Sequence, residues 1–392
     1  MENIIPKTSS SLSKMWNKIL NLKNSLFPEL QESLRVEEFS SKESKLIRVL
    51  DFAEIEKFIT ITSPTNTPKF RKQIARAFIA KSVYNFQTTR ELIDRLQNDR
   101  ILRILCGWRY KNDIPSESTF SRAFDEISTL QIAQKTHKKF VKEYLSEKIF
   151  FYNATDATKI PLREKVVKKT KEEPKVKYKV GRPKKGEIRE LIKPTILEQQ
   201  KEMQTVEEKL SLISTDCGVG IKQNSKGNRE VWIGGKLHIS TVDGDIPITA
   251  FYSGANVHDS SVALPLMQET NKRVNYLYDL QDAGYDADII REYSYVLGHR
   301  PIIDINPKNS KALKTKIELQ KHERETFSYL NQHLNCDEQH YNQRSMAERV
   351  NKLLKDDYGC NKIYYQGAVK VASVLAFGIL SICINQSLKL VI

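Results

Sequence analysis

Apolar residues before about residue 149 recur three and four positions apart, the spacing of an amphipathic helix. Residues 1–65 have a mixed form of this pattern and end in the breaker-rich stretch ITSPTNTPKF. In residues 71–108 the apolar positions are Ile74, Phe78, Ile79, Leu92, Leu96, Ile101, Leu102 and Leu105. The spacing there predicts two or three short helices.

A polar break that contains Pro115 separates these helices from a further helical pattern. Ser116 suits the N-cap position, and Phe120 and Phe124 form an apolar stripe behind it. Helices joined by a short turn in this way predict a helix-turn-helix-like unit, with a plain helical bundle as the alternative.

From residue 149 the pattern changes to the aromatic and β-branched residues that are typical of strands. IFFYNATDATKI predicts a strand that ends near Asp156, and residues 230–256 predict two strands joined by a tight turn at residues 243–245. The pattern then predicts a helix at 260–272, a strand at 274–281, a helix at 286–298, a strand at 301–306 and a helix at 341–355. This order predicts an α/β fold with a mixed sheet flanked by helices.

These patterns divide the chain into three predicted parts. Residues 1–65 form an N-terminal helical segment, residues 66–145 a helical domain, and residues 146–392 an α/β domain with an insertion at 163–230. The apolar stretch VASVLAFGILSICI, residues 371–384, has no charge but is shorter than the roughly 20 residues of a membrane span. We therefore predict a buried C-terminal helix and no membrane partner.

The composition of the chain indicates what kind of molecule it binds. The chain has 392 residues and 63 Lys and Arg against 48 Asp and Glu, a net charge of +15 that favours a polyanion such as nucleic acid. Its five cysteines include no C-x-x-C pair, so neither a disulfide framework nor a thiolate zinc site is indicated. We expect a reducing, cytoplasmic location.

More than half of that net charge lies in one stretch of the insertion. Residues 163–185 contain eleven Lys and Arg and three Glu, a net of +8, and are low in apolar content. Within them GRPKK resembles the core of an AT-hook, which makes Arg182, Lys184 and Lys185 candidate DNA-binding residues. The alternative is a solvated basic loop.

The helix predicted at 341–355 has a polar ridge. At about 100° per residue, its residues Tyr341, Arg344, Glu348 and Lys355 fall within a wedge of about 60°. The apolar residues of the helix lie on its opposite side. An ordinary solvated face can have this pattern as well, so spacing alone does not decide between the two.

Two carboxylates far away in the sequence favour a catalytic role for this ridge. Asp156 and Asp282 each follow an apolar strand, where an unpaired buried carboxylate would be costly. At the ends of adjacent strands they would project from one edge of the sheet, and a helix packed across that edge would add Glu348. Three carboxylates at one point predict two Mg²⁺ or Mn²⁺ ions and in-line phosphoryl displacement.

Together these motifs resemble those of a known family. Asp156 in YNATDAT, Asp282 in LQDAGYD and the pattern Y-x₂-R-x₃-E-x₆-K at 341–355 are similar to the DDE transposases of bacterial insertion sequences, in the group with a Tyr-Arg-Glu-Lys helix. VWIGGKLHISTVDGDIP, SGANVHDS and the stretch from FRKQIARAFIA to FSRAF also fit. Asp282 and Glu348 are only 66 positions apart, too few for the additional β-domain that some members have there.

The resemblance implies an RNase H-like catalytic domain behind an all-α DNA-binding domain. It implies binding to terminal inverted repeats, metal-dependent cleavage at the transposon ends and joining of the 3′-hydroxyl to target DNA. Asp156, Asp282 and Glu348 would hold the metals, and Tyr341, Arg344 and Lys355 would contact double-stranded DNA. The expected assembly is a homodimer on DNA, associated with the nucleoid in the cytoplasm.

Alternatives remain open at this stage. Asp279 lies close enough to Asp282 to replace it, and His258 with Asp259 could form a catalytic pair or a helix start. At the level of function, the alternatives are a transposase-derived DNA-binding protein without catalysis and a metal-dependent RNase H-like nuclease.

Overall fold

The structure, a computed structural model, describes Met15, Lys18 and residues 39–59, 69–167, 194–223, 227–307, 310–326 and 336–391. The candidate AT-hook residues Arg182, Lys184 and Lys185 lie outside these residues.

The first part of the described chain is helical, as predicted. Its α-helices are α3 (Ser41–Ala53), α4 (Arg71–Val83), α5 (Thr89–Asn98), α6 (Arg100–Cys106), α7 (Glu117–Thr129) and α8 (Ile132–Tyr144). Ser116 stands at the N-cap of α7, although its hydroxyl contacts those of Ser118 and Thr119 rather than a helix N–H. The helices α4, α5 and α6 confirm the spacing of apolar residues over 71–108.

A mixed sheet follows. Its strands are β1 (Ile149–Pro161), β2 (Gly218–Gln223), β3 (Arg229–Val242), β4 (Ile246–Gly254), β5 (Asn275–Gln281) and β6 (Arg300–Ile303). The order is β2-β3-β1-β5-β6, and β4 also pairs with β3. β3 is antiparallel to β1, β2 and β4, whereas β5 is parallel to β1 and β6. The predicted mixed α/β fold is therefore confirmed.

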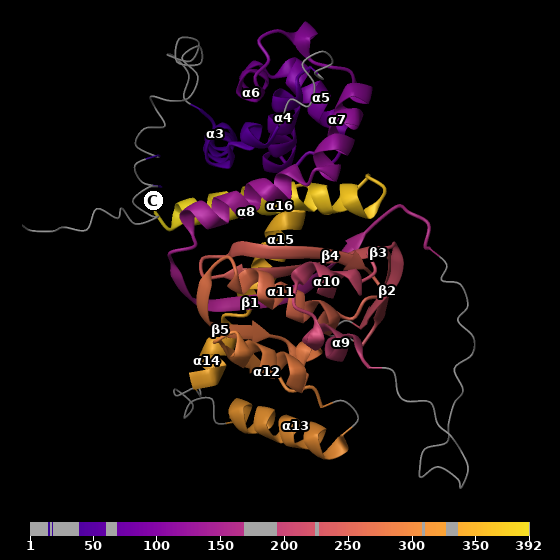
Figure 1. The fold of residues 1–392 in the computed structure, drawn as a ribbon, viewed down its shortest axis with the longest axis vertical. Coiled ribbons are helices and arrows are strands. Elements are labelled where there is room, and N and C mark those ends of the chain that lie inside the picture. The colour runs from indigo at the N-terminus through magenta and orange to yellow at the C-terminus, as the bar shows by residue number, and fades with distance from the viewer. Residues whose placement is uncertain are drawn as a thin grey trace, which may run out of the picture.

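Helices lie around this sheet (Figure 1). They are α9 (Ile196–Glu202), α10 (Val206–Ser211), α11 (Ala263–Asn271), α12 (Asp288–Val296), α13 (Lys311–Thr326), α14 (Cys336–Asn342), α15 (Ser345–Asp356) and α16 (Ala368–Lys389). The described end of the 163–230 insertion is part of the fold, because β2 pairs with β3 and the buried amide of Gln200 in α9 donates to the Ser261 carbonyl.

The C-terminal helix α16 lies at the centre of the molecule. Figure 1 shows it beside α8, between the N-terminal helices and the sheet. It contacts α3, α4, α7 and α8 as well as β4 and α15, so one apolar core includes residues from both parts, such as Phe78, Phe377 and Ile248. Within the described chain α16 is the one helix long and apolar enough to cross a membrane, and 67% of its most apolar window is buried inside the protein. The prediction of a buried helix over 371–384 is confirmed.

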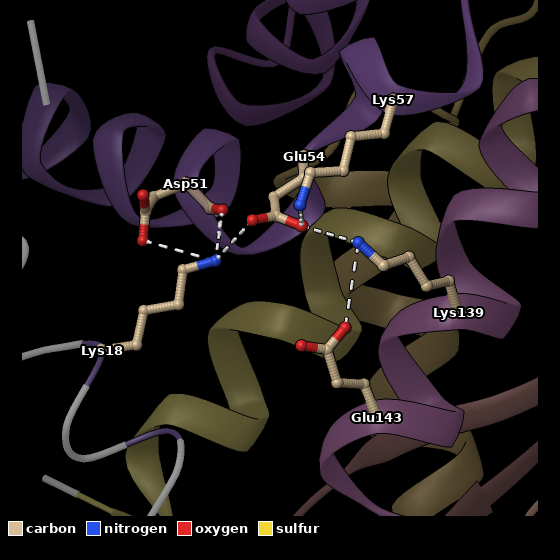
Figure 2. A network of polar contacts seen from close by, with 6 residues as sticks. All are labelled: Lys18, Asp51, Glu54, Lys57, Lys139 and Glu143. Atoms are coloured by element: carbon tan, nitrogen blue, oxygen red, sulfur yellow. Dashed lines mark hydrogen bonds and ion pairs between the residues drawn. The ribbon is translucent and has the colours of Figure 1, made fainter. Parts of the chain in front are cut away.

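A network of ion pairs ties the N-terminal helices together (Figure 2). Glu54, directly after α3, accepts from Lys18, Lys57 and Lys139, at 3.2, 2.7 and 2.6 Å. Burial opposes the charge of this carboxylate, but the three ammonium groups outweigh burial and lower the pKa of Glu54 to about 2. Glu54 has φ 46°, a left-handed conformation that is uncommon for a side chain of this type.

Two element boundaries differ from the prediction. β1 does not end near Asp156 but continues to Pro161, because residues 157–161 go on pairing with β3 after β5 has ended. The single helix expected at 341–355 is two helices, α14 and α15, joined by a tight turn at residues 343–344. A third difference is α13, which lies between the strand predicted at 301–306 and the helix predicted at 341–355, where no helix was predicted.

Candidate active site

The register of the sheet brings Asp156 and Asp282 together. β1 and β5 run parallel, and their last pair is Thr155 with Gln281. Asp156 and Asp282 are the next residues of the two strands, so they stand side by side where the β1–β5 ladder ends. Asp282 directly follows its strand, as predicted. Asp156 does not, because β1 continues to Pro161 in its pairing with β3.

The surroundings of Asp156 oppose its negative charge. Burial and the neighbouring carboxylate of Asp282 raise the pKa of Asp156 to about 6, although the Ala157 N–H, Arg344 and Asn351 act in the opposite direction. A divalent cation between the two carboxylates would remove their repulsion. The oxygen donors therefore fit the hard cations Mg²⁺ and Mn²⁺.

Asp282 is held by the turn that follows it. It is the N-cap of the short 3-10 helix Ala283–Tyr285, and its Oδ1 accepts from the Gly284 N–H at 2.9 Å. A Cβ at Gly284 would lie 3.0 Å from that oxygen, closer than nearly all such contacts. This glycine leaves the carboxylate of Asp282 room beside the backbone.

Helix α15 crosses the same region and carries Glu348. Its carboxylate is 55% exposed and accepts from Arg344 Nη2 at 2.7 Å, one helical turn away. Within the described residues no three His, Cys, Asp or Glu side chains come together closely enough to hold a metal ion. In this conformation Glu348 is paired with Arg344, so a role as third ligand requires that ion pair to open.

Asn351 is a site residue that the sequence analysis missed. It is buried on α15, and its Nδ2 donates to Asp156 Oδ2 at 2.9 Å. On the helical wheel it lies at about 280°, beside Arg344 at about 300°, so a polar residue at the margin of the ridge was the available signal. The amide thus holds one oxygen of Asp156 in place.

Two buried polar atoms at this site have no hydrogen-bond partner within the described parts of the chain. They are Arg344 Nε, a donor, and Asn351 Oδ1, an acceptor. Unpaired buried polar atoms are costly, which makes them indicators of an external partner. A phosphate oxygen suits the guanidinium, and a water bound to a cation suits the amide oxygen.

The other residues of the predicted ridge lie at its two ends. Tyr341 is on α14, half-buried, with the Arg344 guanidinium 5.6 Å from its ring centroid. Lys355, in the last turn of α15, donates to the Thr158 hydroxyl of β1. Arg344 and Lys355 both lie close enough to Asp156 for their charges to interact with it.

The alternative residues have structural roles. Asp279 is fully buried and accepts from Asn153 at 2.9 Å and from Ser294 at 2.6 Å, so it belongs to the core of the sheet. His258 caps the 3-10 helix Asp259–Val262, so the two residues do mark a helix start. Asp259 pairs with Lys236 at 2.8 Å.

Comparison with known protein families agrees with this geometry. A family model described as "Transposase DDE domain" matches residues 154–384, which is more than half of the chain. A second, described as "Transposase domain (DUF772)", matches residues 33–126. No curated protein matches the chain. The first match covers β1 to α16, and the second covers α3 to α6 and most of α7.

Proposed function

The chain belongs to the family of DDE transposases, and from this premise we propose that it binds the terminal inverted repeats of an insertion sequence, cleaves DNA at both ends and joins the freed 3′-hydroxyl to target DNA. The family membership makes the chain a DNA transposase with an RNase H-like catalytic domain, and such enzymes use divalent metal ions. The observation that carries the finer proposal is the adjacency of Asp156 and Asp282 at the end of the β1–β5 ladder.

In this proposal Asp156, Asp282 and Glu348 hold two Mg²⁺ ions. Bound there, the ions would supply Lewis-acid activation of a water or 3′-hydroxyl and stabilisation of the leaving oxygen. Asn351 keeps Asp156 oriented by its hydrogen bond. When DNA binds, Arg344 donates to a phosphate oxygen in place of Glu348. The Glu348 carboxylate is then free to hold a metal ion.

The remaining roles concern DNA. Tyr341 and Lys355 hold the strand on either side of the scissile phosphate, and the helical domain at 66–145 contacts the terminal repeat. Arg182, Lys184 and Lys185 add contacts from the basic insertion. The proposed assembly is a homodimer on two transposon ends, without a membrane partner, associated with the nucleoid.

The test is cleavage of duplex DNA that carries the inverted repeats flanking the gene. Wild type is compared with Asp156→Asn, Asp282→Asn and Glu348→Gln, which keep the shape of each side chain. We expect each to lower the cleavage rate at least about 1,000-fold in Mg²⁺, because each removes a ligand charge from the reaction. Glu207→Gln, an exposed carboxylate on α10, is the control and should cleave like wild type.

The outcomes separate the alternatives. Full activity in one of the three variants would remove that residue from the site, and cleavage in excess chelator would contradict the metal mechanism. A protein that binds the repeats but cleaves nothing would be a DNA-binding protein without catalysis. Cleavage that ignores the repeats would indicate a nuclease.

A further inference from the structure

Three lysines from three elements lie within electrostatic reach of one another beyond Asp156 along β1. Lys159 is on β1, three residues beyond Asp156. Lys355 on α15 donates to Thr158, the residue before Lys159. Lys222 is on β2, the edge of the sheet, and stands opposite Glu230 in the β2–β3 ladder. The charges of Lys159 and Lys222 both act on Lys355, so the three ammonium groups lie near one another.

One carboxylate neutralises part of this charge. Glu230 is 48% exposed and forms an ion pair with Lys159. The hydrogen bond from Lys159, together with the charges of Lys222 and Lys355, lowers the pKa of Glu230. All three lysines therefore act on the same carboxylate.

The three ammonium groups also repel one another. Burial and the charges of Lys159 and Lys222 lower the pKa of Lys355, against the attraction of Asp156 and Asp356. A further anion would relieve this repulsion. Because exposed ion pairs contribute little to folding, the Lys159–Glu230 pair is also easily exchanged for another partner.

We propose that Lys159, Lys222 and Lys355 form a phosphate-binding site for the DNA strand that leaves the catalytic carboxylates, and that Glu230 is an internal anion which the DNA phosphate displaces. The inference rests on the proposed function for the nature of the ligand. Lys159 lies about 10 Å along β1 from Asp156, at roughly 3.3 Å per residue. Phosphates of one strand rise about 3.4 Å each, so the site holds the backbone a few nucleotides from the cut.

Because a DNA phosphate must displace Glu230, DNA binds more weakly than it would to the three lysines without this carboxylate. Each DNA contact at this site must replace an existing ion pair, so only part of the charge attraction appears as affinity. Glu230 thus limits how firmly the enzyme holds DNA beside its active site. Removing its charge should strengthen binding, the opposite of the usual effect of a substitution in a binding site.

The first experiment measures binding of a mixed-sequence duplex DNA by fluorescence anisotropy in calcium, over a range of salt concentrations. We expect Glu230→Gln to bind about fivefold more tightly near physiological salt and to steepen the log–log salt slope by about 0.9, the effect of one additional phosphate contact. Glu292→Gln is the matched control, because it also removes an exposed carboxylate from a lysine, Lys201, but on α9 and α12.

A second set of variants tests whether the tighter DNA binding of Glu230→Gln depends on the lysines. Lys159→Gln should weaken binding only slightly in the wild-type background, where Glu230 already neutralises it, and should abolish the gain in the Glu230→Gln background. Lysine acetylation followed by mass spectrometry gives a direct measurement. DNA should protect Lys159 and Lys222 more strongly in Glu230→Gln than in wild type.

Two results would overturn the inference: binding by Glu230→Gln that is unchanged or weaker, and a gain no larger than that of Glu292→Gln. Neither depends on cleavage. If wild type fails to cut transposon ends while Glu230→Gln still binds DNA more tightly, the proposed function fails and the phosphate site stands. If cleavage occurs and the gain is absent, only the phosphate site is wrong.

Discussion

At the scale of single residues, the site depends on how Asp156 is held. One of its oxygens accepts from Asn351, whose own Oδ1 is buried and unpaired within the described chain. Supporting hydrogen bonds of this kind orient a metal ligand without touching the metal. We therefore propose that Asn351 positions Asp156, and its effect should appear in the rate and not in DNA binding.

We predict that Asn351→Ala lowers the cleavage rate about 10–100-fold, the usual cost of losing such a bond, while the Kd for DNA stays within about twofold of wild type. Single-turnover cleavage and anisotropy measure the two quantities. Asn361→Ala, an exposed asparagine in the loop after α15, is the control and should change neither. Equal losses of rate and affinity would assign Asn351 to DNA contact instead.

Sequence alone predicts those residues whose position follows from a local pattern. Asp282 directly follows an apolar strand, and that strand is β5 as expected. The partner of Asn351 could not be predicted, because it depends on how deeply α15 packs against β1. The ion pair between Arg344 and Glu348 follows their spacing of four, but its consequence for a metal site appears only with Asp156 nearby.

At the scale of elements, α16 sets the position of α15. Gly378 on α16 faces α15, and a Cβ there would lie 2.5 Å from Leu354 Cδ1 and 3.0 Å from Cys360 Sγ. Leu354 is fully buried. The absence of a side chain at one residue of α16 thus allows the helix with Glu348, Asn351 and Lys355 to approach.

We predict that Gly378→Ala destabilises the protein by about 1–3 kcal/mol through overpacking, although alanine favours a helix over glycine by about 1 kcal/mol. Urea unfolding measures the change. The loss should nearly disappear when Leu354 is already alanine, because the clashing methyl is then absent. A stabilising Gly378→Ala would show that the two helices are not in close contact.

Element boundaries were less predictable than the elements themselves. The tight turn at 343–344 contains neither Gly nor Pro, so no helix breaker in the sequence indicates that α14 ends. β1 is longer than predicted because β3 supplies partners as far as Pro161. Pairing between distant segments therefore decided the end of β1.

At the scale of the whole molecule, the helical part and the sheet share one core through α16. The change of pattern at residue 149 indicates where strands begin, but apolar contacts join the residues before it to those after it. The network around Glu54 adds polar contacts on the outer side of this assembly, where α3, α8 and Lys18 meet (Figure 2).

We predict that Glu54→Gln lowers the free energy of unfolding at pH 7 by about 1–2 kcal/mol, a figure reduced for solvent screening because the carboxylate is partly exposed. The folded pKa lies below the ordinary value, so this stabilisation is complete above pH 4.5 and is lost as the pH falls toward about 2. Urea midpoints for wild type and variant should therefore converge in acid.

Glu143→Gln is the control for this prediction. Glu143 belongs to the same network, but its carboxylate lies 3.8 Å from Lys139 Nζ, a longer contact than those of Glu54. Its loss should change stability by less than about 0.5 kcal/mol. Equal effects of the two variants, or a Glu54→Gln effect that is as large at pH 2 as at pH 7, would contradict the role assigned to Glu54.

The central place of α16 also has a consequence for synthesis of the chain. A polypeptide emerges from the ribosome in order, at roughly 5–20 residues per second, and earlier domains usually fold first. Here α3, α4, α7 and α8 all contact a helix that is made after β6 and α15. The N-terminal helices of a nascent chain therefore keep apolar surface exposed until α16 arrives. Chaperone binding to ribosome-bound chains should be strongest just before that point, and DNA binding should begin only after it.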